Sequence, residues 1–146
     1  MLYLTHAWIK LCVHQPFYRH TPGTSRCVAW TGLAIRESDL AALRVLDLFN
    51  TYNRHHELHK APACAVPIAF LAGVVFIYQA ERLRGMREER AAASGRLGQI
   101  MRILSMMERT WQCARQPQAI LEQYNSRLNN EEARYAPRSP SYLSQN

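Results

Sequence analysis

The chain has 146 residues, enough for one domain, and its four cysteines lie far apart with no CxxC pair. A zinc cluster needs closely spaced thiolates, so this spacing excludes one within the chain and predicts free, mostly buried thiols in a reducing compartment. The formal charge of +7 permits binding to acidic surfaces. Four arginines lie close together in the sequence, Arg82, Arg84, Arg87 and Arg90, but glutamates are interspersed among them. This pattern predicts a solvated helix face instead of a nucleic-acid patch.

The first predicted helix covers residues 2–15. Leu4, Trp8 and Leu11 recur at helical spacing, so one face of this helix is apolar and is expected to pack against other helices. Pro16 is predicted to end the helix, because a proline disfavours the helical conformation of the residue before it and supplies no N–H.

A loop rich in turn-forming residues is expected over 21–25, and residues 30–37 are interpreted as an irregular insertion or a retained intron-like stretch. The second predicted helix begins with Ser38 as its N-cap, since a serine side chain can accept a hydrogen bond from a free N–H of the first turn. Apolar residues three to four positions apart continue this helix as far as Tyr52, and its end is expected between residues 53 and 60.

The third predicted helix, residues 62–84, is apolar nearly all round, and residues 61–80 carry no charge. Two interpretations are open. About 20 uncharged residues suffice to cross a bilayer, so this segment is a candidate membrane span. A central helix enclosed by others gives the same pattern, and Pro62, Pro67 and the small alanines favour that second interpretation.

Two more helices are predicted, one over residues 88–109 and one beginning near Pro117, which suits a first helical position. The fold class is therefore all-α, an irregular bundle of about five helices over residues 1–128. Residues 129–146 are predicted to form a disordered tail. The apolar faces of the last two helices are expected to hold Leu97, Ile100, Met101, Leu104 and Met107, and then Ile120, Leu121, Tyr124 and Leu128.

Few residues suggest chemistry. His55 and His59 would share a helix face at i, i+4 spacing, but the sequence is not HExxH and shows no third ligand, which favours an exposed helix end over a zinc site. Met106 and Met107 with Trp111 are expected to fill a helix interface, the alternative being an adaptable pocket for a small effector or a partner helix. We predict no catalytic, cofactor-binding or metal-ligating residue.

Four segments occur in an order that resembles a known family. They resemble the motifs YHWLxILLHRPFYRR, AAxxILxLLxxY, PPxxxxxxFxAGTVHL and LxxMxxTWxxAxxxxxIL of the fungal-specific regulatory domain found in zinc binuclear cluster transcription factors. Thr5 and Gln15 depart from the first motif, where tyrosine and arginine are usual. The segments consist of His6, Trp8, Leu11, His14 and residues 16–19; residues 41–49 with Tyr52; Pro62, Pro67 and residues 70–76; and residues 104–107 with Trp111, Ala114, Ile120 and Leu121.

The resemblance spans roughly residues 2–128, about the last third of the usual regulatory domain. It implies that the chain is part of a larger helical regulatory domain in a nuclear transcription factor and is not an enzyme. Zinc and DNA contacts would belong to an N-terminal cluster that this chain lacks, so no cofactor is expected here. The expected partners are the rest of the regulatory domain or other transcription proteins, with homodimer formation open and no membrane involved.

Two other classes stay open. The main alternative is a membrane-associated helical protein anchored through residues 61–80. A small helical enzyme or metal protein would depend on the histidines alone. If the family interpretation is right, the isolated chain is expected to be marginally stable, with an apolar patch larger than the few hundred Å² usual for a soluble monomer around Trp8, Leu11, Phe70 and Phe76.

Overall fold

The computed structural model describes residues 2–18 and 25–135, and the side chains of residues 2–14 and 31–130. Five α-helices and no strand occur in these ranges, so the predicted all-α irregular bundle is confirmed. Two short 3-10 helices, η1 (Leu58–Lys60) and η2 (Gln112–Ala114), lie in the connections. The α-helices are α1 (Leu2–Tyr18), α2 (Ser25–His55), α3 (Ala65–Arg82), α4 (Arg87–Glu108) and α5 (Arg115–Tyr135).

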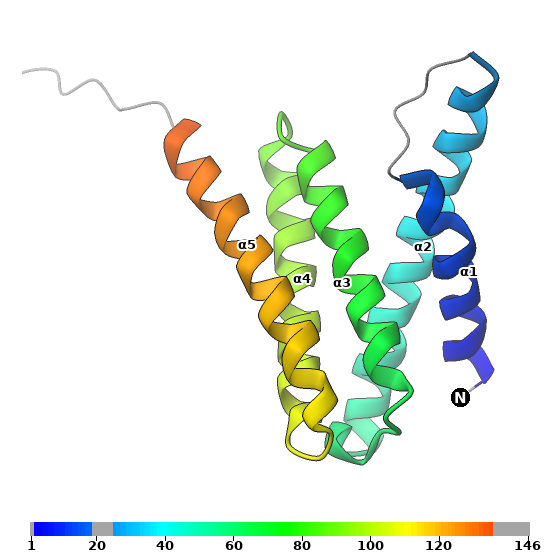
Figure 1. Ribbon diagram of the computed structural model, residues 1–146, viewed down its shortest axis with the longest axis vertical. Coiled ribbons are helices and arrows are strands. Elements are labelled where there is room, and N and C mark those ends of the chain that lie inside the picture. Colours follow the sequence, from blue (N-terminus) through cyan, green and yellow to red (C-terminus); the bar gives the residue numbers. More distant parts are fainter. Residues whose placement is uncertain (1, 19–24, 136–146) are drawn as a thin grey trace, which may run out of the picture.

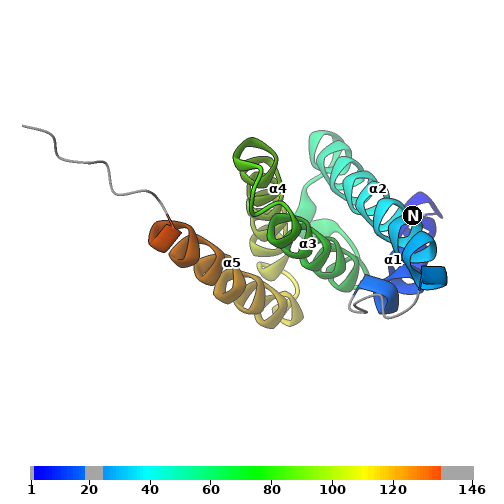
Figure 2. The same cartoon turned by 90° about the horizontal axis from the view of Figure 1, so that it is seen from above.

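The helices form two layers, with α1, α3 and α5 in front of α2 and α4 (Figures 1 and 2). The central helix of the front layer, α3, contacts the four other α-helices. A helix with neighbours on most of its sides needs no wide polar stripe, which explains why its sequence is apolar nearly all round. Its buried residues are Ala65, Val66, Ile68, Ala69, Ala72, Gly73, Val75, Phe76, Ile77 and Ala80.

A glycine lets two helices approach α3 closely. A Cβ atom at Gly73 would lie 2.6 Å from Leu121 Cδ1 and 3.2 Å from Ile100 Cγ2. Both of these neighbours are themselves fully buried, so they have little room to move away. The small residue at this position therefore sets how near α4 and α5 lie to the centre of the bundle.

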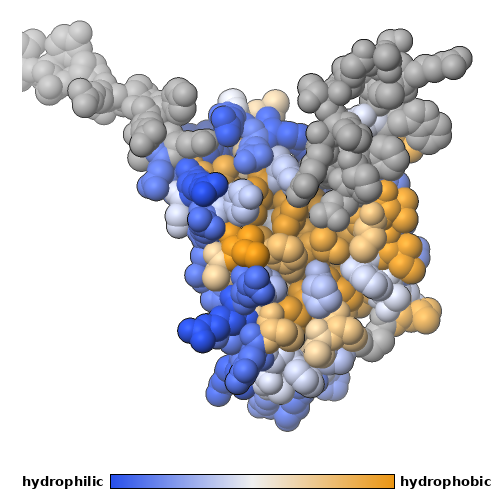
Figure 3. Space-filling view, viewed as in Figure 1, coloured by the Kyte–Doolittle hydropathy of each residue, from blue (hydrophilic) through white to orange (hydrophobic). Residues whose placement is uncertain are grey.

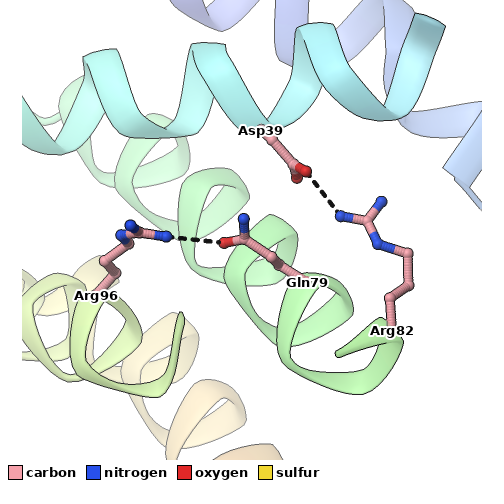
Figure 4. A network of polar contacts seen from close by, with 4 residues as sticks. All are labelled: Asp39, Gln79, Arg82 and Arg96. Atoms are coloured by element: carbon pink, nitrogen blue, oxygen red, sulfur yellow. Dashed lines mark hydrogen bonds and ion pairs between the residues drawn. The ribbon is translucent and has the colours of Figure 1, made fainter. Parts of the chain in front are cut away.

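Polar contacts join α3 to the rear layer near its C-terminal end (Figure 4). Arg82 Nη2 donates to Asp39 Oδ2 on α2 at 2.7 Å, and Arg96 Nη1 on α4 donates to Gln79 Oε1 at 3.4 Å. These side chains are partly solvent-exposed, so the contacts orient the helices more than they stabilise them.

The outer helices are also linked to the rear layer by polar contacts. Lys10 Nζ on α1 donates to Glu37 Oε2 on α2 at 3.1 Å, and this hydrogen bond is the main reason that the pKa of Glu37 lies below its usual value. Arg90 Nη2 on α4 donates to the backbone oxygen of Leu128 on α5 at 2.9 Å. Arg82 and Arg90 therefore make contacts between helices.

Two predicted boundaries near the N-terminus are wrong. The first helix continues through Pro16 to Tyr18, because a proline in the last turn removes one backbone hydrogen bond without stopping the chain from remaining helical. The second helix begins at Ser25, so residues 30–37 are helical and not an irregular insertion. Of the loop expected over 21–25, the first four residues lie outside the described range.

Ser38 is not an N-cap. It lies well inside α2, it is buried, and its Oγ has no hydrogen-bond partner. A serine before an apolar repeat is a local signal for a helix start, whereas the position of Ser38 is decided by the helices that pack around it.

The C-terminal prediction also needs correction, since α5 runs to Tyr135 and the first residues of the expected tail, 129–135, are helical. Residues 136–146 lie outside the described range. The cysteines differ as well: Cys12, Cys64 and Cys113 form no disulfide but are exposed instead of mostly buried. Cys27 lies outside the range in which side chains are described.

Candidate functional site

An apolar groove of about 240 Å³ lies between α3 and α5. Its α3 wall consists of residues three to four positions apart, which a helix places along one side. Because α2 and α4 cover the opposite side of α3, this side is left half-buried. The groove is lined by Phe70, Val74, Ile77, Tyr78 and Glu81 of α3 and by Ile120 and Tyr124 of α5.

The first helix presents apolar residues on two opposite sides. Ala7 and Leu11 are buried against the bundle. Leu2, Ile9 and Val13 share the other side at i, i+7 and i+11 spacing, and they are 84%, 52% and 56% exposed. This outer stripe was not predicted, although its spacing is visible in the sequence, because the prediction assigned one apolar face to the helix.

We call the α3–α5 groove and the outer stripe of α1 together the open face. Figure 3 shows the front of the molecule, where apolar side chains gather over α3 and α1 while hydrophilic side chains cover the α5 edge. Isolated apolar side chains are normal on a surface, but a continuous apolar region usually marks a contact with another macromolecule.

An exposed apolar patch was predicted around Trp8, Leu11, Phe70 and Phe76, and two of these four residues are at least partly exposed. Trp8 is 37% exposed and Phe70 is half-buried, as the prediction requires. Leu11 and Phe76 are buried, so these two residues were wrongly assigned to it. The rear layer covers more of the apolar surface than the sequence suggested, and the exposed part is shifted to the front.

The histidines do not share one helix face. The second helix ends at His55, and His59 lies in η1 after a break in the helix. No group of three or more histidine, cysteine, aspartate or glutamate side chains within the described residues could hold a metal ion. The structure therefore assembles no ligand set from this pair, and the absence of bound zinc stays a prediction.

The side chains of Met106, Met107 and Trp111 mainly pack against the core. Met107 is fully buried, and Met106 and Trp111 pack against the core while partly exposed. Trp111 Nε1 donates to the backbone oxygen of Ala61 at 2.6 Å, which fastens the end of α4 to the connection between α2 and α3. An interface role accounts for Met107 and Trp111, and Met106 also lines a polar cavity described below.

No protein-family model, curated protein or solved structure matches this chain. The fold class is established by the helices, while assignment to a family stays a prediction that depends on the four motifs.

Proposed function

We propose that this chain is the regulatory part of a fungal nuclear transcription factor and that it lacks a DNA-binding zinc cluster of its own. The ordered motifs support the proposal, because their described residues fall on successive elements: the first on α1, the second on α2, the third on α3 and its approach, and the fourth on α4, α5 and the connection between them. In this role the chain transmits a signal through protein contacts and catalyses no reaction.

The open face is the observation that carries this proposal. A helix that is apolar on two opposite sides, as α1 is, suits a position between two other elements. Covering its outer stripe would remove apolar surface from water at a gain of roughly 25 cal/mol per Å². We therefore expect the open face to be covered by another part of a larger regulatory domain or by another transcription protein.

A reporter assay tests the proposal. The chain is fused to a heterologous DNA-binding domain in a fungal cell, and expression from a reporter carrying that domain's binding site is measured. We expect a severalfold change relative to the DNA-binding domain alone. We also expect Ile9→Asp with Val13→Asp to abolish the change, because two carboxylates on the outer stripe of α1 would oppose an apolar contact.

The control substitution is Met86→Asp, which introduces the same charge at another exposed apolar residue, on the turn between α3 and α4. It should leave the reporter effect intact. Reporter expression equal to that of the DNA-binding domain alone, with the fusion present in the nucleus at normal level, would contradict the proposal.

The alternative function is a membrane-associated protein anchored through residues 61–80. One observation favours it: α3 is long and apolar enough to cross a membrane. Against it, 56% of that helix is buried by its neighbours, as in the core helix of a soluble protein. Carbonate extraction of fungal membranes separates the two, because a spanning helix stays in the pellet and the proposed regulatory protein does not.

A metal analysis separates the proposal from the metal-protein alternative. The regulatory proposal expects no stoichiometric zinc on the purified chain after dialysis. One zinc per chain that is lost when His55 and His59 are both replaced by alanine would favour a metal protein instead.

A further inference from the structure

A cavity of about 590 Å³ lies at one end of the bundle, where the end of α2, η1 and the end of α4 meet. Three side chains with fixed positive charge line it: Arg54 of α2, Lys60 of η1 and Arg109, the residue that follows α4. Its volume is within the range of small-molecule sites, which is roughly 300–1,000 Å³. Its residues are distinct from the open face.

Negative charge in this cavity is scarce. Glu57 is the carboxylate among its lining residues, and it already accepts a hydrogen bond from Lys60 Nζ at 2.7 Å and lies 3.4 Å from His59 Nε2. The hydrogen bond from Lys60 is the main reason that the pKa of Glu57 is lowered. Arg54 and Arg109 form no ion pair with any described residue, so their guanidinium groups are available to a ligand.

Helix dipoles explain part of this pattern. Basic residues at the C-terminal ends of helices interact favourably with the free carbonyl groups there, which accounts for Arg54 on α2 and for Arg109 after α4. Helix dipoles alone do not explain why the C-terminal ends of α2 and α4 line the same cavity as Lys60. Arg54 and Arg109 line the cavity without a carboxylate partner of their own among the described residues, and a bound anion would supply the missing counter-charge.

We propose that this cavity binds a small polyanion, a phosphate ester or a polycarboxylate with two or more negative charges. The two guanidinium groups can each form paired hydrogen bonds to such a group, and the ammonium of Lys60 adds a third charge-assisted donor. Further hydrogen-bonding groups line the same cavity on Asn53 and on the imidazoles of His55, His56 and His59. A polyanion suits the site better than a single charge because the cations come from three different elements.

Calorimetric titration of the full chain with pyrophosphate and with citrate, at low salt and neutral pH, tests the proposal. We expect saturable binding at one site. Arg54→Gln combined with Arg109→Gln should weaken it by about tenfold or more, since two charge-assisted hydrogen-bonding groups are lost. Arg87→Gln is the control, because it removes one guanidinium charge at the opposite end of α4 and should leave affinity unchanged.

A variant that binds more tightly provides a second test, because a misfolded protein can explain a loss of binding but not a gain. Glu57→Gln removes the competing carboxylate and frees Lys60, so it should tighten pyrophosphate binding by about threefold at low salt. Tighter binding of pyrophosphate than of citrate would assign the site to phosphate esters, and the reverse order to polycarboxylates. The proposal is overturned if neither anion binds at millimolar concentration, or if Arg87→Gln weakens binding as much as the double variant does.

Discussion

The two sides of α3 differ in what covers them, although the helix is apolar on both. Phe76 is fully buried in the core, whereas Phe70, six residues earlier on the same helix, is half-buried in the wall of the α3–α5 groove. The same side chain is thus a core residue at one position and part of an open face at the other. Burial in this bundle is decided by where the neighbouring helices lie.

Alanine substitutions at the two phenylalanines should show the largest difference in stability between the two sides of α3. Phe76→Ala should lower the free energy of unfolding by about 3–5 kcal/mol, because it leaves a cavity among fully buried neighbours. Phe70→Ala should cost roughly 1 kcal/mol, since less apolar surface is lost from the core. Urea denaturation followed by circular dichroism measures both, and equal losses would mean that the two sides of α3 are covered alike.

Two glycines allow a second comparison of stability, between a crowded position on α3 and an open position on α4. Gly95→Ala in α4 meets no neighbouring atom within 4 Å and should stabilise the chain through helix propensity. Gly73→Ala places a methyl group against Leu121 and Ile100, so overpacking opposes the same gain. We expect Gly73→Ala to be less stable than Gly95→Ala by about 1–3 kcal/mol in the same denaturation experiment. Identical midpoints would contradict the close approach of α5 to α3.

The last expected effect concerns Ser38, which is buried within α2. Its buried hydroxyl has no hydrogen-bond partner, so Ser38→Ala removes an uncompensated desolvation cost and should stabilise the chain by about 1 kcal/mol. Thermal unfolding monitored by circular dichroism is sufficient to detect the change. A clear loss of stability would show that the hydroxyl has a partner after all.

The fold was predictable where apolar periodicity is strong. Residues 62–84 and 88–109 were predicted within a few residues of α3 and α4, because long apolar repeats dominate both segments. The start of α2 was missed because Ser38 carries the same local signal at a helix start and in a helix interior. Pro16 was predicted to end the first helix, but near a helix end the free-energy cost of a proline is small enough for the helix to continue past it.

The surfaces were less predictable than the helices. The sequence shows that Leu11 and Val13 are both apolar, but only the packed structure shows that the first is buried and the second exposed. Likewise, the basic cavity joins Arg54 and Lys60 to Arg109, which is distant in the sequence, and the spacing along the chain gives no sign of this meeting.

The most direct test of the central claim, that the open face is a surface for protein contact, is sedimentation velocity over a range of concentrations. We expect the purified chain to associate as its concentration rises, and the variant with Ile9→Asp and Val13→Asp to stay monomeric while Met86→Asp associates like the original chain. A chain that remains monomeric at all concentrations and unfolds in one sharp, reversible transition would contradict the claim and indicate a self-sufficient five-helix domain.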